Sequence, residues 1–206
     1  MKSLLSCLSI GLLAFGFTSC AITKKLAPDK HARFSSRSDY KKTLAVYKDE
    51  ALLEQGNSSN TKVRIDLSDQ RGQLFVNEKV AMDFPCCTGK PGKRTPQGNF
   101  RITSKIATKR SNIFGTLYKN GKRVYGGDRR KYSGSYDRYV GSALPYWMRL
   151  TDDGIGMHYS GYVHRYPGSN GCIRMPKDPV KIVFSKTKVG TPVQICLLYT
   201  SDAADE

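Results

Sequence analysis

The sequence predicts a mainly β protein, with a helical leader before the strands and one short helix near the end. Apolar and polar residues alternate with period two over residues 63–67, as in a half-buried strand. Turn-forming Gly, Asn and Asp separate the short apolar runs that follow. Helical spacing of apolar residues is confined to residues 39–53 and to the stretch after Asp178. Strands are therefore expected to make up most of the fold.

The chain is expected to begin with a lipoprotein signal peptide. Residues 4–17 are mostly apolar but shorter than a typical spanning helix. Thr18 and Ser19 stand directly before Cys20, which resembles the bacterial lipoprotein signal whose cysteine is acylated. The alternative is a plain secretory signal with a coincidental cysteine. Because Ala21 rather than Asp follows, the resemblance favours a periplasmic protein anchored to the outer membrane through Cys20.

A tether and a short helix are expected between this anchor and the first strand. Residues 21–37 are polar and basic, which suits a tether. Apolar residues recur at helical spacing over residues 39–53, and Ser38 or Asp39 can cap the start of that helix.

The strands that follow predict an antiparallel meander with one buried and one exposed face. Strands are expected at residues 63–67, 73–76, 80–87 and 99–104, with turns at 69–72 and 77–79 and a loop at 88–98. Adjacent Cys86 and Cys87 are expected to point to opposite faces as small apolar fillers, one inward and one outward.

The second half of the chain predicts a cleft wall, two strands and a helix. Residues 106–146 are basic, rich in Tyr and Gly and weakly periodic, and such a stretch is expected to form a lid or cleft wall. Asn120-Gly121 within it is a hairpin signal. A strand over residues 154–158 delivers His158. Asp178 is expected to cap a short helix with Pro179 at its first position, and residues 189–195 form a last strand.

Cys172 and His158, fourteen positions upstream, are the candidate catalytic pair. A thiol and a base are the minimum equipment for acyl transfer through a thioester. His158 can take the thiol proton and, as imidazolium, stabilise the thiolate. Gly171 lets a substrate approach the backbone, and the N–H groups of Gly171 and Cys172 are the expected oxyanion donors. The alternatives are a buried structural cysteine and a satisfied core imidazole.

The net charge of the chain indicates which kinds of binding partner to expect. The formal net charge is +17, which suits a polyanion, and because export is expected the available polyanions are lipid head groups and wall carboxylates rather than nucleic acid. A solvated basic surface is the alternative.

Apart from Cys172, only Cys86 and Cys87 remain in the expected folded part, so a disulfide framework is not expected.

Four short motifs follow one another along the chain, at residues 88–90, 95–100, 155–158 and 169–174. In this order they resemble the L,D-transpeptidase catalytic domains of bacterial cell-wall synthesis, across residues 63–195. The resemblance implies an L,D-transpeptidase-type β-sandwich or barrel-like fold, a thiol nucleophile, peptidoglycan stem peptides as substrate, and no metal or organic cofactor. It also implies that a backbone carbonyl near residues 159–161 orients the histidine.

One residue departs from the family pattern. Asn170 stands where the family usually has a His directly before the Gly-Cys pair, and Asn cannot titrate. His164 is a weak substitute and is expected to be an exposed loop residue.

Further residues are candidates for substrate binding. Arg174 lies two positions after Cys172, where a guanidinium can grip a substrate carboxylate or brace the loop by a salt bridge. The remaining substrate-binding candidates are Ser169, Asn170, Tyr159 and Trp147. Turn preference for Ser169 and core packing for Trp147 are the alternatives.

These observations divide the chain into four segments. They are a signal peptide at 1–19, a tether and short helix at 20–60, the catalytic domain at 61–195, and residues 196–206, whose sequence matches an in-frame translation of a transposon sequencing adapter.

The expected protein is a monomeric peptidoglycan L,D-transpeptidase. Cys172 would attack the bond between the third stem residue and D-Ala, forming cross-links or attaching a protein to the wall. An L,D-carboxypeptidase and a non-catalytic wall-binding lipoprotein are the alternatives.

Overall fold

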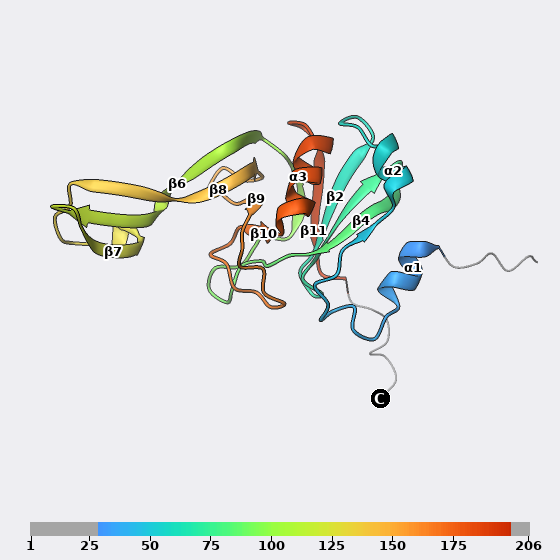
Figure 1. The fold of residues 1–206 in the computed structure, drawn as a ribbon, viewed down its shortest axis with the longest axis horizontal. Coiled ribbons are helices and arrows are strands. Elements are labelled where there is room, and N and C mark those ends of the chain that lie inside the picture. Colours follow the sequence, from blue (N-terminus) through green and yellow to red (C-terminus); the bar gives the residue numbers. More distant parts are fainter. Residues whose placement is uncertain (1–28, 199–206) are drawn as a thin grey trace, which may run out of the picture.

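A computed structural model describes residues 29–198 and is mainly β, as predicted (Figure 1). The first of two sheets contains six strands, β1 (Tyr47–Lys48), β2 (Thr61–Asp66), β3 (Arg71–Val76), β4 (Lys79–Pro85), β5 (Gly98–Arg101) and β11 (Pro192–Cys196), in the spatial order β1-β4-β3-β2-β11-β5. The second contains five strands, β6 (Ser104–Lys119), β7 (Lys122–Asp128), β8 (Arg138–Arg149), β9 (Gly156–Tyr159) and β10 (Ile173–Met175), in the spatial order β10-β9-β8-β6-β7.

The predicted antiparallel meander is present as β2, β3 and β4. Asn77 and Glu78 both have positive φ in the turn between β3 and β4. The expectation of one exposed face holds in part on β2, where Lys62 and Arg64 are partly exposed, but is wrong on β4, which is buried at every position from Ala81 to Pro85. The N-terminal segment covers the face that was expected to be wet.

The predicted helix over residues 39–53 is wrong. Two six-residue helices, α1 (Lys30–Ser35) and α2 (Glu50–Gln55), flank a segment in which Tyr47 and Lys48 pair with β4. The Asp49 side chain accepts a hydrogen bond from the Leu52 N–H and so starts α2 anew. Strand pairing and this cap therefore divide residues 39–53, which the spacing of apolar residues predicted to be one helix.

Buried polar contacts hold the N-terminal segment on the sheet. The Arg71 guanidinium, 2% exposed, pairs with Asp83 at 2.7 Å and donates to the carbonyls of Thr43 and Ala45. The Tyr40 hydroxyl donates to Asp83 at 2.8 Å. Part of the predicted tether is therefore folded as α1, while the signal peptide, Cys20 and the start of the tether lie outside the described residues.

Residues 106–146, expected to be weakly structured, form long antiparallel strands instead. β6 pairs with β7 and β8, and the hairpin at Asn120-Gly121 is confirmed, with φ of 52° and 75°. The β6–β8 register shifts between Arg110 and Gly115. Beyond this bulge, residues 111–141 project from the body (Figure 1), and we call them the arm. Sequence periodicity missed them because neither face of the arm strands is consistently buried.

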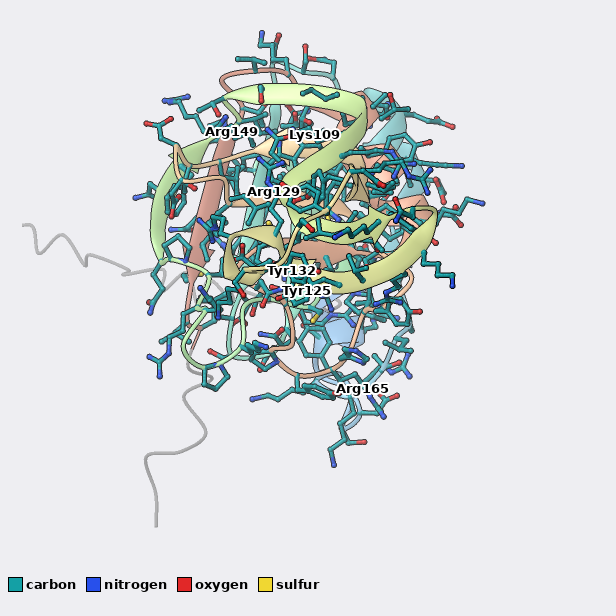
Figure 2. The ribbon with its side chains drawn as sticks, turned by 90° about the vertical axis from the view of Figure 1, so that its left-hand side faces the viewer. Lys109, Tyr125, Arg129, Tyr132, Arg149 and Arg165 are labelled. Atoms are coloured by element: carbon teal, nitrogen blue, oxygen red, sulfur yellow. The ribbon has the colours of Figure 1, made fainter. Side chains whose placement is uncertain are left out.

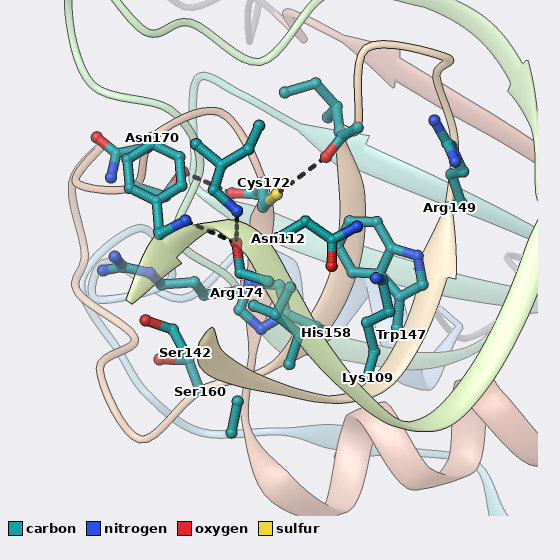
Figure 3. A pocket seen from close by; sticks show the side chains of 18 of the residues that line it. Lys109, Asn112, Ser142, Trp147, Arg149, His158, Ser160, Asn170, Cys172 and Arg174 are labelled. Atoms are coloured by element: carbon teal, nitrogen blue, oxygen red, sulfur yellow. Dashed lines mark hydrogen bonds between the residues drawn. The ribbon is translucent and has the colours of Figure 1, made fainter. Parts of the chain in front are cut away.

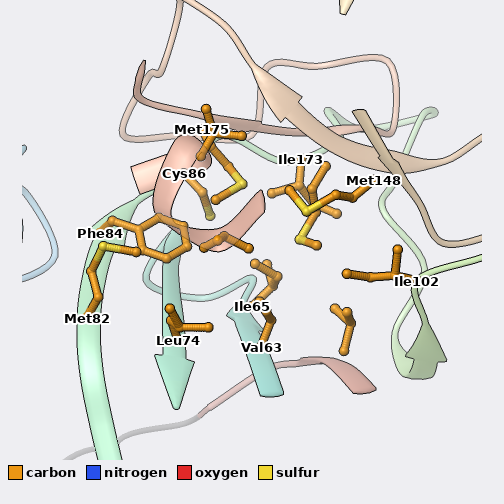
Figure 4. Close-up of a cluster of buried hydrophobic side chains, with 14 of the residues drawn as sticks. Val63, Ile65, Leu74, Met82, Phe84, Cys86, Ile102, Met148, Ile173 and Met175 are labelled. Atoms are coloured by element: carbon orange, nitrogen blue, oxygen red, sulfur yellow. The ribbon is translucent and has the colours of Figure 1, made fainter. Parts of the chain in front are cut away.

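The hydrophobic core lies between the sheets and under α3 (Lys177–Lys186). It joins side chains of both sheets, among them Val63, Ile65, Leu74, Met148 and Ile173 (Figure 4). Burying each such side chain contributes about 1.5–3 kcal/mol. Val180 and Val183 of α3 are fully buried against them.

Two local predictions near the core are wrong. The N-cap of α3 is Pro176, not Asp178, because the helix begins two residues earlier than expected and Asp178 lies in its first turn. Cys86 and Cys87 are both fully buried, because a loop covers the outward side and brings the Tyr166 carbonyl 3.5 Å from the Cys87 sulfur. Both are free thiols.

No helix within residues 29–198 is long and apolar enough to cross a membrane.

Candidate active site

A cavity of about 1020 Å³ opens between the five-stranded sheet and the base of the arm (Figure 3). Seven sequence-predicted residues line it, namely Cys172, His158, Arg174, Ser169, Asn170, Tyr159 and Trp147. The arm contributes the bulge residues 111–114 and Arg130, which confirms the expectation of a cleft wall. These seven residues, far apart in part along the chain, therefore lie around one cavity.

Parallel pairing of β9 with β10 places the candidate base on β9 and the candidate nucleophile at the start of the neighbouring strand, in one cavity. His158 on β9 is the register partner of Arg174 on β10, and Cys172 immediately precedes β10. Alternate residues of a strand share a face, so Cys172 and Arg174 both project into the cavity. The Cys172 thiol lies 3.7 Å from the Gly154 carbonyl (Figure 3).

The His158 ring is fixed from two sides. Its Nδ1 lies 2.7 Å from the backbone carbonyl of Tyr159, the acceptor expected just after the histidine. A carbonyl can only accept, so Nδ1 carries the proton and Nε2 is left as a free base. The Trp147 ring packs on the other side, with centroids 6.2 Å apart, and is 4% exposed. Trp147 thus acts as packing for the base as well as cavity lining.

Burial favours the neutral forms of both groups. Burial lowers the pKa of His158 to about 4, against the hydrogen bond to the Tyr159 carbonyl, and the Arg174 charge lowers it further. Burial also raises the pKa of the Cys172 thiol, against the backbone N–H of Gly156 and the Arg174 charge. The resting pair is therefore thiol and imidazole, and the proton must move during the reaction.

The two expected oxyanion donors differ. The Gly171 N–H donates to the Ser169 hydroxyl oxygen at 3.0 Å and is not available. Within residues 29–198 the Cys172 N–H has no hydrogen-bond partner, so it remains a candidate donor. Gly171 itself has φ of 115°, and a Cβ there would lie 2.5 Å from the Ile155 side chain. Glycine is needed here for conformation and space.

Buried side chains hold residues 169–172, which precede β10 and which we call the cysteine loop, in place. Ser169, 2% exposed, donates through its hydroxyl to the Cys172 carbonyl at 2.6 Å. Its side chain is thus engaged by the loop rather than free for substrate. Thr95 donates to the Gly171 carbonyl at 2.7 Å. Its motif was recognised in the sequence, but this tie to the cysteine loop was not.

A further positioning residue, Gln70, was missed. Its amide donates to the Thr88 hydroxyl and its carbonyl accepts the Thr88 N–H at 2.9 Å. The Thr88 carbonyl in turn accepts the N–H groups of Gly168 and Ser169. The only sequence signal was its place in a turn, where Gln70 adopts φ of 52°.

Arg174 makes no ion pair within the described part of the chain, so the bracing salt bridge is not observed. Lys93, Arg94, Lys109, Arg130 and Arg149 line the same cavity, against the acidic Asp152 and Asp153. The cavity therefore suits an anionic ligand. His164 stacks on Tyr166 with centroids 4.9 Å apart and does not line the cavity, so it does not replace the missing histidine. No His, Cys, Asp and Glu cluster between residues 29 and 198 forms a metal site.

Comparison with known proteins identifies the family. The YkuD family model, described as an L,D-transpeptidase catalytic domain, matches residues 60–195. No match was found among curated proteins.

Solved structures share the fold. An L,D-transpeptidase from Mycobacterium smegmatis is 17% identical, with 66% of this chain and 58% of that chain covered and a TM-score of 0.52. LdtMt1 in complex with imipenem is 22% identical, with coverages of 66% and 59% and a TM-score of 0.52. An L,D-transpeptidase from Xylanimonas cellulosilytica is 17% identical, with coverages of 68% and 62% and a TM-score of 0.51. The chain spans less than two thirds of the length of each of these structures. On the strength of the family match, the chain belongs to the L,D-transpeptidase catalytic domain family.

Proposed function

We propose that the chain is a peptidoglycan L,D-transpeptidase that works through a thioester on Cys172. The observation that carries this is the placement of Cys172 and His158 in one cavity, with the Tyr159 carbonyl leaving His158 Nε2 free as a base. The family match supports the reaction class.

In the proposed first half-reaction, the Cys172 sulfur attacks the carbonyl carbon between the third stem residue and D-Ala. The thiol proton passes to His158 Nε2 as the carbon–sulfur bond forms. The Cys172 N–H stabilises the oxyanion. The tetrahedral intermediate collapses, the C–N bond breaks, and His158 returns the proton to the departing D-Ala amine.

The second half-reaction transfers the acyl group. An acceptor amine attacks the thioester carbonyl and gives its proton to His158. The carbon–sulfur bond then breaks, and the Cys172 thiolate recovers that proton. Attack by water instead would give the carboxypeptidase. We favour transfer to an amine because the family whose model the chain matches is named for transpeptidation.

Arg174 and the neighbouring cations are proposed to orient the stem. Arg174 lies beside the reacting pair without an acidic partner in the described residues, and its guanidinium can hold a stem carboxylate in a bidentate grip. Asn170 is exposed at the cavity rim and supplies an amide for hydrogen bonding.

The test is product analysis after incubation with tetrapeptide muropeptides. We expect cross-linked dimers and free D-Ala from the unaltered chain and from Cys196→Ala, and neither product from Cys172→Ala. Trimmed tripeptides without dimers would assign the carboxypeptidase. Identical product profiles for Cys172→Ala and the unaltered chain would refute the thioester mechanism.

We also propose that Cys20 anchors a monomeric enzyme to the periplasmic side of the outer membrane. Support comes from the apolar stretch and the Thr18-Ser19-Cys20 signal. Metabolic labelling with an alkyne fatty acid should mark the chain and Cys7→Ala but not Cys20→Ala. Label retained by Cys20→Ala, or recovery in the inner-membrane fraction, would contradict this placement.

A further inference from the structure

The arm carries an excess of exposed positive charge. Residues 111–141 contain seven Lys or Arg and two Asp. Asp128 is used inside the arm, where it pairs with Arg130 at 2.7 Å. Asp137 accepts the Asn120 N–H at 2.6 Å. Lys122, Arg123 and Lys131 are exposed and have no ion-pair partner within residues 29–198.

Tyrosine rings lie among these cations. Tyr125 and Tyr132 stack with centroids 5.3 Å apart, and Tyr136 extends the group at 6.4 Å from Tyr132. The Arg129 guanidinium lies 4.8 Å from the Tyr139 ring, which limits its conformations. Figure 2, which looks along the arm, shows Tyr125, Tyr132 and Arg129 close together. The arm therefore presents a partly rigid surface of aromatic rings and cations.

This surface continues into the active-site cavity. Arg130 and residues 111–114 belong to the arm and also line the cavity that holds Cys172. A polymer lying along the arm would therefore be within reach of the nucleophile.

The side chains of the arm favour a partner that carries both sugar rings and carboxylates. Tyrosine rings offer apolar faces and a polar edge, which suit sugar rings, and free cations suit carboxylates. Membrane insertion would need a larger apolar area. In the arm only Val124 and Tyr136, 38% and 43% exposed, are large exposed hydrophobic residues.

We propose that the arm is a second binding surface, outside the reacting centre, for the carboxylate-bearing glycan–peptide polymer of the wall. The arm holds the polymer by charge and ring contacts while one stem enters the cavity. This proposal rests on the proposed function for its choice of polymer.

The test is cosedimentation of the full chain with purified insoluble peptidoglycan. The arm variant combines Lys122→Glu, Arg123→Glu and Lys131→Glu, none of which lines the cavity. The control combines Lys177→Glu, Lys181→Glu and Lys188→Glu, which are exposed on the body and change the net charge equally. We expect the arm variant to bind about tenfold or more weakly and the control to stay within about twofold of the unaltered chain. Raising the salt concentration should weaken the arm-dependent binding.

Three outcomes would overturn the proposal. They are equal losses in both triple variants, no loss in the arm variant, and arm-dependent binding to vesicles with about one third phosphatidylglycerol but not to peptidoglycan. Acylation of the unaltered chain by imipenem, the ligand in the LdtMt1 structure, reports the proposed function separately. If imipenem does not acylate the chain but wall binding still depends on the arm, the proposed enzyme activity is refuted and the binding role of the arm is not. If imipenem acylates the chain but wall binding does not depend on the arm, only the binding role of the arm is refuted.

Discussion

The cysteine loop and the arm use their polar groups in opposite ways. In and around the cysteine loop, the side chains of Ser169, Thr95 and Gln70 are buried and hydrogen-bonded to backbone groups. In the arm, cations such as Lys122 and Lys131 are exposed and unpaired within the described chain. The comparison indicates that the loop provides fixed geometry for a reaction, whereas the arm provides charge for contact. Substitutions should therefore affect chemistry in the loop and binding in the arm.

Among variants that keep the Cys172 thiol, the largest effect is expected for His158→Gln. Loss of the base should slow acylation by imipenem about a thousandfold, because no other titratable side chain takes its hydrogen-bonded position against Tyr159. His164→Gln is the matched control and should react like the unaltered chain, since His164 does not line the cavity. Stopped-flow rates with an unfolding curve for each variant check this. Equal losses in both variants would remove His158 from its role.

Gly171→Ala should come next, with acylation reduced about a hundredfold. The added Cβ would meet the Ile155 Cδ1 at 2.5 Å, and φ of 115° would strain alanine by about 1–3 kcal/mol. Adding Ile155→Val removes the close contact but not the backbone strain, so the double variant should recover only part of the rate. Full activity of Gly171→Ala would show that the loop is not rigid.

Ser169→Ala should lower the free energy of unfolding by about 1–3 kcal/mol, because two hydrogen bonds to the cysteine loop are lost and the Gly171 N–H is left unpaired. We expect about a tenfold slower acylation with it. Ser185→Ala, on the exposed side of α3, is the control and should change stability by less than about 0.5 kcal/mol. Similar unfolding curves for the two variants would contradict the positioning role.

The acid side of the pH profile tests the neutral resting pair. Because the pKa of His158 is lowered to about 4, its base form persists well below pH 6.5, the ordinary value. The acylation rate at pH 5.5 should stay within about twofold of that at pH 7. A tenfold fall would mean an ordinary imidazole. Since the unfolded chain binds the proton first, the free energy of unfolding should decline as pH falls from 6.5 toward 4.

The smallest effect on stability is expected in the arm. The triple substitution Lys122→Glu, Arg123→Glu and Lys131→Glu should change the free energy of unfolding by less than about 0.5 kcal/mol per site, because these side chains are exposed. Chemical denaturation measures this. A loss comparable to that of Ser169→Ala would mean that the arm cations support the fold.

The sequence predicted those parts whose pattern is local. Period-two alternation found β2, and Asn120-Gly121 found the β6–β7 hairpin. The helix over 39–53 failed because strand pairing of Tyr47 with Asp83 is a long-range contact. The strands of the arm were not predicted because neither of their faces is consistently buried, which leaves no clear alternation of apolar and polar residues.

In the candidate active site, too, some features could be predicted from the sequence and others could not. Cys172 and His158 were predicted because their chemistry is visible in their residue types. The hydrogen bond from Thr95 to the Gly171 carbonyl, and the contact of Gln70 with Thr88, depend on how separate segments meet in space. Neither contact leaves a pattern in the order of residues.

The central claim is that the acyl group of a stem is carried by the Cys172 sulfur. The direct measurement is intact mass of the full chain after incubation with tetrapeptide donor, followed by peptide mapping of the adduct. We expect one added tripeptide acyl group, found on the peptide that contains Cys172 and absent from Cys172→Ala. An adduct on Cys86, Cys87 or Cys196, or no adduct while D-Ala is still released, would contradict the claim.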